Sequence, residues 1–198
     1  MSIEPIPSAE SSDVPPPQSR EPQSKHLLAV WDELRLWGGT LLSAAVYATI
    51  IVTFIGQIAR VDGFSMTPTL EDHDRLVVNK LAYRWHKPAI GDIVMVASPH
   101  KPETMLVKRV VAGPGDVVRS VDGRVYRNDV LVPDDFVAAD ERSFDDWGPE
   151  VVPEGYYFVL GDHRNDSFDS RSFGPVPEKY IAGKVQLRWW PIDRSRLF

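Results

Sequence analysis

Hydrophobic and polar positions divide the chain into three stretches with different patterns. Residues 1 to about 26 contain six prolines and many serines but few large apolar side chains. The next stretch, from Leu36 to Ala59, has 24 consecutive positions without a charged residue. From residue 60 onward, short runs of branched and aromatic residues are separated by Gly, Pro, Asn and Asp. This pattern predicts a polar tail, one long apolar helix and a β domain.

The first two stretches predict a disordered tail over residues 1–35 and a transmembrane helix over residues 36–59. The tail is too poor in apolar side chains to offset the entropy lost on ordering. An uncharged helix of this length measures about 36 Å, enough to cross a hydrocarbon core of ~30 Å. Trp37 at one edge and the flanking Arg35 and Arg60 are typical of interface anchors. A buried core helix or a cleaved signal peptide fits less well, because the uncharged run is too long.

The third stretch predicts a mainly β, antiparallel and partly barrel-like domain over residues 60–198. Asp122-Gly123, between two apolar runs, is a two-residue hairpin signal, and Asn128-Asp129 is a weaker one. Helical patterns that could connect parallel strands are missing from the sequence. Between Val132 and Tyr156 the pattern leaves room for only a short loop. The expected strands are Arg75–Val78, Asp92–Ala97, Met105–Val111, Val117–Val121, Arg124–Arg127, Val130–Val132, Tyr156–Leu160 and Lys184–Trp190.

Charge and composition exclude several classes of protein but leave the membrane orientation open. The net charge of −6 argues against a broad cationic surface for nucleic acid. The absence of cysteine excludes a disulfide scaffold and thiolate catalysis. Residues 1–35 and residues 60–80 each contain three Lys or Arg residues, so the positive-inside rule favours neither orientation.

The candidate catalytic residues begin just after the uncharged stretch, in the segment GFSMTPTL at residues 63–70. A serine two residues after glycine in a tight turn can be an exposed nucleophile, which makes Ser65 a candidate. Lys108 lies in the predicted strand Met105–Val111, where alternation places Leu106 and Val110 on the same face. Burial on that face would lower the pKa of Lys108 and make it a general base. Snorkelling of its ammonium to solvent at a sheet edge is the alternative.

A third cluster, GDHRNDSFDSRSFG at residues 161–174, combines carboxylates, arginines and hydroxyls. A calcium site is disfavoured, because the spacing is not that of an EF-hand and the arginines would compete for the carboxylates. Aspartate–arginine pairs that hold a serine in a rigid loop fit better. His163 is interpreted as a scaffold residue of this loop. The chain also lacks a His-Glu-x-x-His segment, so neither a metal nor a cofactor is expected.

Taken together, these segments resemble the type I signal peptidases (leader peptidases), membrane-anchored serine proteases that use a Ser/Lys dyad. The similar segments are GFSMTPTL, DRLVVNK with its continuation to residue 94, KRVVAGPGD at residues 108–116, and residues 161–174. They follow the family's order after the expected membrane span and cover about residues 61 to 190. His163 departs from the pattern, because the family usually has Asn there.

The resemblance implies a role for each matching residue of the dyad and its surroundings. Ser65 would attack the scissile carbonyl, and Lys108 would take its proton, return one to the leaving amine and activate the deacylating water. Ser167 would hydrogen-bond and orient the lysine. The backbone N–H groups of Ser65 and Gly63 would form the oxyanion hole.

The resemblance also implies structural ion pairs and shallow apolar substrate pockets. The expected pairs are Asp162 with Arg164, and Asp169 with Arg171. The pockets would select small residues one and three positions before the cut, as in Ala-x-Ala. By position they would be lined by Met66, Leu70, Leu106 and Val107.

By the same resemblance, the protein would lie in a bacterial cell membrane or a related internal membrane. It would span that membrane once, with its tail cytoplasmic and its catalytic domain extracytoplasmic. Its partners would be the signal peptides of exported pre-proteins and the lipid bilayer, near the secretion translocon. Four tryptophans are candidates for contact with lipid headgroups, with packing inside the domain as the alternative: Trp85, Trp147, Trp189 and Trp190.

Two other functions remain as alternatives at this point. A self-cleaving repressor-type peptidase shares Ser/Lys chemistry, but it would need a helix-turn-helix domain where this chain has a tail and an apolar stretch. A membrane-anchored β adhesion or assembly module would keep the same segments for structure alone. In that module, replacing Ser65 or Lys108 would cause no loss of function.

Overall fold

The computed structural model describes residues 23–50 and 56–198, which divide into two compact units between Val46 and Tyr47. Helix α1 (Gln23–Ile50) begins earlier than the sequence predicts. The predicted disordered tail is therefore wrong for residues 23–35, which follow the last proline of the tail and are rich in good helix formers. Its remainder, residues 1–22, lies outside the described residues.

The end of the predicted transmembrane helix is also corrected. Residues 56–59, expected to be helical, belong to strand β1 (Gly56–Arg60), which pairs with β2 (Arg75–Asn79). An uncharged run cannot distinguish a helix from an apolar strand that follows it, because hydropathy is the same for both. Among residues 23–50 and 56–198, no helix is both long enough and apolar enough to cross a membrane.

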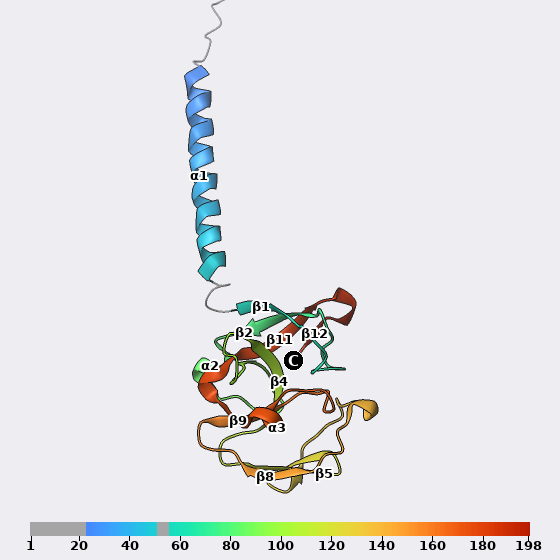
Figure 1. The fold of residues 1–198 in the computed structure, drawn as a ribbon. Helices are drawn as coiled ribbons and strands as arrows, with labels where there is room; N and C mark the ends of the chain where they lie inside the picture. The colour runs from blue at the N-terminus through green and yellow to red at the C-terminus, as the bar shows by residue number, and fades with distance from the viewer. Residues whose placement is uncertain (1–22, 51–55) are drawn as a thin grey trace, which may run out of the picture. The chain divides into compact units, whose positions relative to one another are not determined.

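The β domain is built from antiparallel pairs throughout its described strands, as predicted. The larger, curled sheet has the order β1-β2-β11-β3-β4-β9-β10, with β12 paired to β11 (Figure 1). A second sheet has the order β7-β6-β5-β8, and Figure 1 shows β5 and β8 at the opposite end of the β domain from β1 and β2. The other strands of the larger sheet are β3 (Ile93–Ala97), β4 (Met105–Ala112), β9 (Tyr156–Leu160), β10 (Val176–Pro177), β11 (Ile181–Trp190) and β12 (Arg196–Leu197).

Both predicted hairpins are confirmed in the smaller sheet. Strands β5 (Val117–Val121) and β6 (Arg124–Arg127) are joined by Asp122 and Gly123, with φ of 50° and 71°. Residues 128 and 129 join β6 to β7 (Val130–Leu131) in the same way, with φ of 50° and 64°. Positive φ at both central positions matches the right-handed twist of the flanking strands.

The expectation of a short loop between Val132 and Tyr156 is wrong. That segment contains strand β8 (Trp147–Val151), which pairs with β5 and completes the smaller sheet. Its sequence, WGPEV, does not alternate in polarity and includes Gly and Pro, so it gives no strand signal. The short helical elements of the domain are α2 (Ala82–Trp85), α3 (Ser170–Phe173), η2 (Ala139–Glu141), η3 (Glu178–Tyr180) and η4 (Ile192–Arg194).

Three buried apolar clusters hold the β domain together, and strand β4 contributes to each of them. Met66 and Leu70 are buried in the first core, with Val107 packed against it. The third core includes Val110, with Leu106 packed against it. The second core joins β4 and β9 to the smaller sheet. Strand β4 is therefore fixed on both faces, which makes it a rigid support for Lys108.

Candidate active site

Ser65 lies in the turn that connects β1 to β2, and we call residues 63–67 the nucleophile turn. The Thr67 N–H donates to the Phe64 carbonyl at 3.0 Å, and Gly63 has a φ of +103° that favours glycine. Met66 directly after the serine is 1% exposed and anchors the turn in the first core. Ser65 itself is half-buried, so its hydroxyl is both supported and accessible.

Lys108 meets Ser65 directly, although 43 positions separate them in the sequence. Its Nζ donates to Ser65 Oγ at 2.6 Å, and the whole residue is only 2% exposed. Burial lowers the pKa of Lys108 to about 8, partly opposed by the carboxylate of Asp169 and assisted by the guanidinium of Arg171. A lysine of this kind readily loses its proton near neutral pH and can then accept the serine proton.

Gly161 creates the space in which the serine and the lysine meet. Arg109 of β4 pairs with Leu160 of β9, so the next residue, Gly161, follows beside Lys108. A Cβ atom at Gly161 would lie 2.3 Å from the Ser65 carbonyl oxygen and 2.2 Å from Ser167 Oγ. Only a glycine therefore lets the nucleophile turn and the loop after β9 approach this closely.

Ser167 lies next to this space, but it makes no hydrogen bond to the lysine. Its Oγ is buried and has no hydrogen-bond partner among the described residues. The predicted contact with Lys108 is thus not formed in this structure. A buried hydroxyl without a partner is costly, which makes Ser167 Oγ an unused donor and acceptor beside the dyad.

The two backbone amides predicted to form the oxyanion hole differ in whether they already donate a hydrogen bond. The Ser65 N–H finds no acceptor within residues 56–198. The Gly63 N–H instead donates to Asp72 Oδ1 at 2.9 Å, a contact that no local pattern predicts. Only the first amide is free to receive a negative oxygen in this arrangement.

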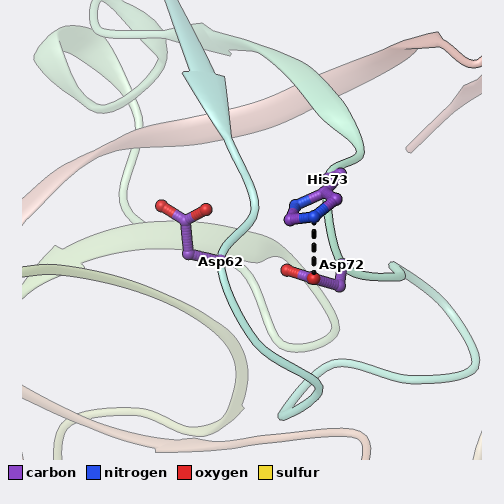
Figure 2. Close-up of side chains that lie close together, drawn as sticks. All are labelled: Asp62, Asp72 and His73. Atoms are coloured by element: carbon purple, nitrogen blue, oxygen red, sulfur yellow. Dashed lines mark ion pairs between the residues drawn. The ribbon is translucent and has the colours of Figure 1, made fainter.

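Asp72 also belongs to a group of three potential metal ligands, with Asp62 and His73, whose ligand atoms lie within 4.8 Å of one another (Figure 2). His73 Nε2 lies 3.3 Å from Asp72 Oδ2. The Arg60 guanidinium contacts two members of this group, with Nη2 at 2.7 Å from His73 Nδ1 and Nε at 3.6 Å from Asp62 Oδ1. These contacts make the group an exposed ion-pair cluster in this structure.

One of the two expected ion pairs forms as predicted, and in the other the aspartate binds a different arginine. Asp169 binds Arg171, with Nη2–Oδ2 at 2.8 Å and Nε–Oδ1 at 2.9 Å. Asp162 binds Arg109 through two bonds of 2.7 and 2.8 Å, and not Arg164 as expected. The β4–β9 register brings Arg109 to Asp162, whereas Arg164 Nε turns back to its own loop and donates to the Gly161 carbonyl at 3.0 Å.

The four predicted pocket residues do not lie on one surface. Leu70 is fully buried in the first core, where it stabilises the turn and cannot touch a substrate. Leu106 and Val107 are neighbours on β4 and pack on different cores, because alternate side chains point to opposite faces of a strand. Three of the four, Met66, Leu70 and Val107, belong to the first core, and of these three Val107 alone is partly exposed.

Comparisons with known proteins give matches that extend over most of the chain. Residues 34–190 match a family model described as signal peptidase, peptidase S26. A probable signal peptidase I-2 from Synechocystis is 36% identical over 172 residues, which cover 84% of this chain and 77% of the relative. A signal peptidase I from Leptolyngbya laminosa is 34% identical, over 92% of this chain and 93% of its own length.

A crystal structure of a signal peptidase I from Enterococcus faecalis is 32% identical, covers 51% of this chain and 98% of that chain, and has a TM-score of 0.46. The family model spans the nucleophile turn, strand β4 and the loop after β9, all of which contribute to the site described above. The similarity to the two relatives likewise extends over most of this chain and most of each relative. The chain therefore belongs to the signal peptidase family, peptidase S26.

Proposed function

We propose that this chain is a serine endopeptidase that removes N-terminal signal peptides from exported precursors, with Ser65 as nucleophile and Lys108 as general base. The observation that supports this most directly is the 2.6 Å contact between Lys108 Nζ and Ser65 Oγ, made by a lysine that is almost completely buried. Family membership supplies the substrate class, because the matching model and relatives are signal peptidases.

The geometry supports an acyl-enzyme mechanism in two halves. Neutral Lys108 takes the proton of Ser65 as Oγ attacks the scissile carbonyl carbon. When the tetrahedral intermediate collapses, the C–N bond breaks and the lysine ammonium returns a proton to the leaving amine. Water then attacks the ester, with Lys108 again accepting a proton, and the Ser65 oxygen leaves with a proton from Lys108.

Two assignments around the dyad are part of this proposal. The oxyanion is stabilised first by the Ser65 N–H, and the Gly63 N–H joins only when it leaves Asp72. Ser167 orients Lys108 by rotating its buried, unpartnered hydroxyl toward Nζ during the reaction. Its position against Gly161, beside the dyad, favours this role.

Selection of small residues before the cut follows from the packing next to Ser65. Met66 and Val107 both pack in the first core. The surface beside the nucleophile is therefore apolar, and core side chains already occupy the space beneath it. An alanine side chain fits against such a surface, while a larger one must displace core atoms. We therefore assign recognition of the residue before the scissile bond to the partly exposed Val107, with the buried Met66 filling the core behind it.

We further propose that the protein is anchored in a membrane by a single span, with the tail cytoplasmic and the catalytic domain outside, close to the translocon. The sequence supports an anchor that ends before β1, because residues 36–55 contain no charged residue. At about 1.5 Å per residue this stretch would measure ~30 Å as a helix. One relative, from Arabidopsis thaliana, is named a mitochondrial inner membrane protease subunit.

The substrate assignment is tested by incubating the full-length protein in detergent with a precursor whose signal peptide ends in Ala-x-Ala. We expect one cut, after the second alanine, identified from the mass of the product. Replacing that second alanine with leucine in the precursor is expected to slow cleavage by on the order of 100-fold. Cleavage at other positions, or an equal rate for the leucine precursor, would refute the assignment.

A further inference from the structure

His163 connects the loop after β9 to the nucleophile turn through two hydrogen bonds. Its backbone N–H donates to the Ser65 carbonyl at 3.2 Å. Its ring Nδ1 lies 3.0 Å from Thr67 Oγ1, a contact between residues 96 positions apart. Both side chains are half-buried. The histidine therefore contacts the turn at the nucleophile and again two residues later.

The direction of the bond between His163 and Thr67 follows from the number of available protons. Thr67 Oγ1 also lies 2.8 Å from the Phe64 carbonyl oxygen, which can only accept a hydrogen bond. The single hydroxyl proton of Thr67 must therefore point to Phe64. His163 Nδ1 then has to donate to Oγ1, which requires a proton on Nδ1.

We propose that His163 is a positioning residue for the nucleophile, acting through a proton held on Nδ1. The Nδ1–H fixes the Thr67 hydroxyl, the hydroxyl holds the Phe64 carbonyl, and these contacts orient Ser65 toward Lys108. This inference rests on the proposed function, because it concerns the efficiency of the same serine. It gives His163 a specific role beyond that of a scaffold residue in the loop.

The other supports of the nucleophile turn act on other groups of the same turn. Met66 anchors it in the first core, and Asp72 holds the Gly63 amide. Neither contact acts on the Thr67 hydroxyl or, through it, on the Phe64 carbonyl, the two groups on either side of the serine that His163 secures. Since a displacement of about 1 Å can cost on the order of 100-fold in rate, a side chain that fixes this turn affects catalysis directly.

Two substitutions with different geometry separate positioning from general packing. In His163→Asn, the side-chain amide nitrogen can occupy the place of Nδ1 and donate to Thr67. In His163→Gln, the longer side chain places its amide where Nε2 was, and the bond to Thr67 is lost. We expect His163→Asn to retain kcat within about twofold and His163→Gln to lose roughly tenfold in kcat with little change in KM.

The measurement uses the full-length protein in detergent with the Ala-x-Ala precursor. Equal kcat values for wild type and His163→Gln would overturn the inference, and so would an equal loss in His163→Asn and His163→Gln. Failure of the wild type to cleave any such precursor would instead refute the proposed function. A Thr67→Ser variant, which keeps the hydroxyl, is expected to behave as wild type, whereas Thr67→Val is expected to match His163→Gln.

A second readout does not depend on activity. Nitrogen NMR of the histidine-labelled full-length protein reports which ring nitrogen carries the proton. The His163 signal is assigned by its disappearance in His163→Asn, at a pH where its own titration shows the ring to be neutral. We expect a protonated Nδ1 and an unprotonated Nε2. The opposite tautomer would overturn the inference even in an active enzyme.

Discussion

Replacing Ser65 with alanine is expected to abolish precursor cleavage while leaving the fold intact. Without the hydroxyl, no group remains at the end of the 2.6 Å contact from Lys108 to attack a carbonyl. Loss of a serine nucleophile in enzymes of this kind lowers kcat by about 10⁶-fold. The half-buried hydroxyl lies in a turn and makes this single side-chain hydrogen bond within residues 23–50 and 56–198, so the melting temperature should change little.

Both readouts are needed for Ser65→Ala. Cleavage is followed by product mass, and unfolding by thermal denaturation at pH 9, where Lys108 is mostly neutral. Ser172→Ala is the matched control, because Ser172 is an exposed serine of the same domain and should keep full activity and stability. Residual cleavage close to wild type, or a large drop in melting temperature with Ser65→Ala, would argue for a structural serine.

Replacing Lys108 with methionine is expected to abolish cleavage and to raise stability at the same time. Methionine has a similar length but cannot accept the Ser65 proton. It also removes a charge from a site where the residue is 2% exposed. Burial lowers the pKa of Lys108 to about 8 from its ordinary 10.5. The positive charge of Lys108 therefore destabilises the folded protein near neutral pH.

The sign of the stability change depends on pH in a defined way. Below about pH 8 the lysine is charged in both the folded and unfolded states, and burial of the charge lowers the free energy of unfolding by its full amount. Between about pH 8 and 10.5 the unfolded state binds the extra proton, so the stability of the wild type rises with pH. The advantage of Lys108→Met should therefore be largest at pH 7 and shrink toward pH 10.5.

Denaturant unfolding at pH 7 and at pH 10 measures this difference. Lys101→Met is the matched control, because Lys101 is exposed and should affect neither activity nor stability. A lower stability of Lys108→Met at pH 7, or cleavage close to wild type, would contradict a buried catalytic lysine.

Local patterns in the sequence predicted the features of the site that depend on local geometry. Alternation along residues 105–111 predicts that Lys108 shares a face with Leu106 and Val110, and the two apolar residues do pack on one core. Asp122-Gly123 predicts its hairpin, because the turn chemistry fixes φ within the two residues.

Features that depend on strand register could not be predicted in this way. Asp162 pairs with Arg109 because β4 lies beside β9, and the sequence does not specify that neighbour. Leu70 follows the nucleophile closely enough to suggest a pocket residue, but its side chain turns into the first core. The bond between His163 and Thr67 likewise joins segments that only the fold brings together.

The dependence of kcat/KM on pH tests the central claim, that neutral Lys108 activates Ser65, more directly than any other measurement. Since the base must be unprotonated, kcat/KM should be highest above about pH 8 and fall by about tenfold per unit at lower pH. Tryptophan fluorescence at each pH verifies that the protein remains folded. A profile that is flat from about pH 5 to 9 for the folded protein would contradict Lys108 as the base.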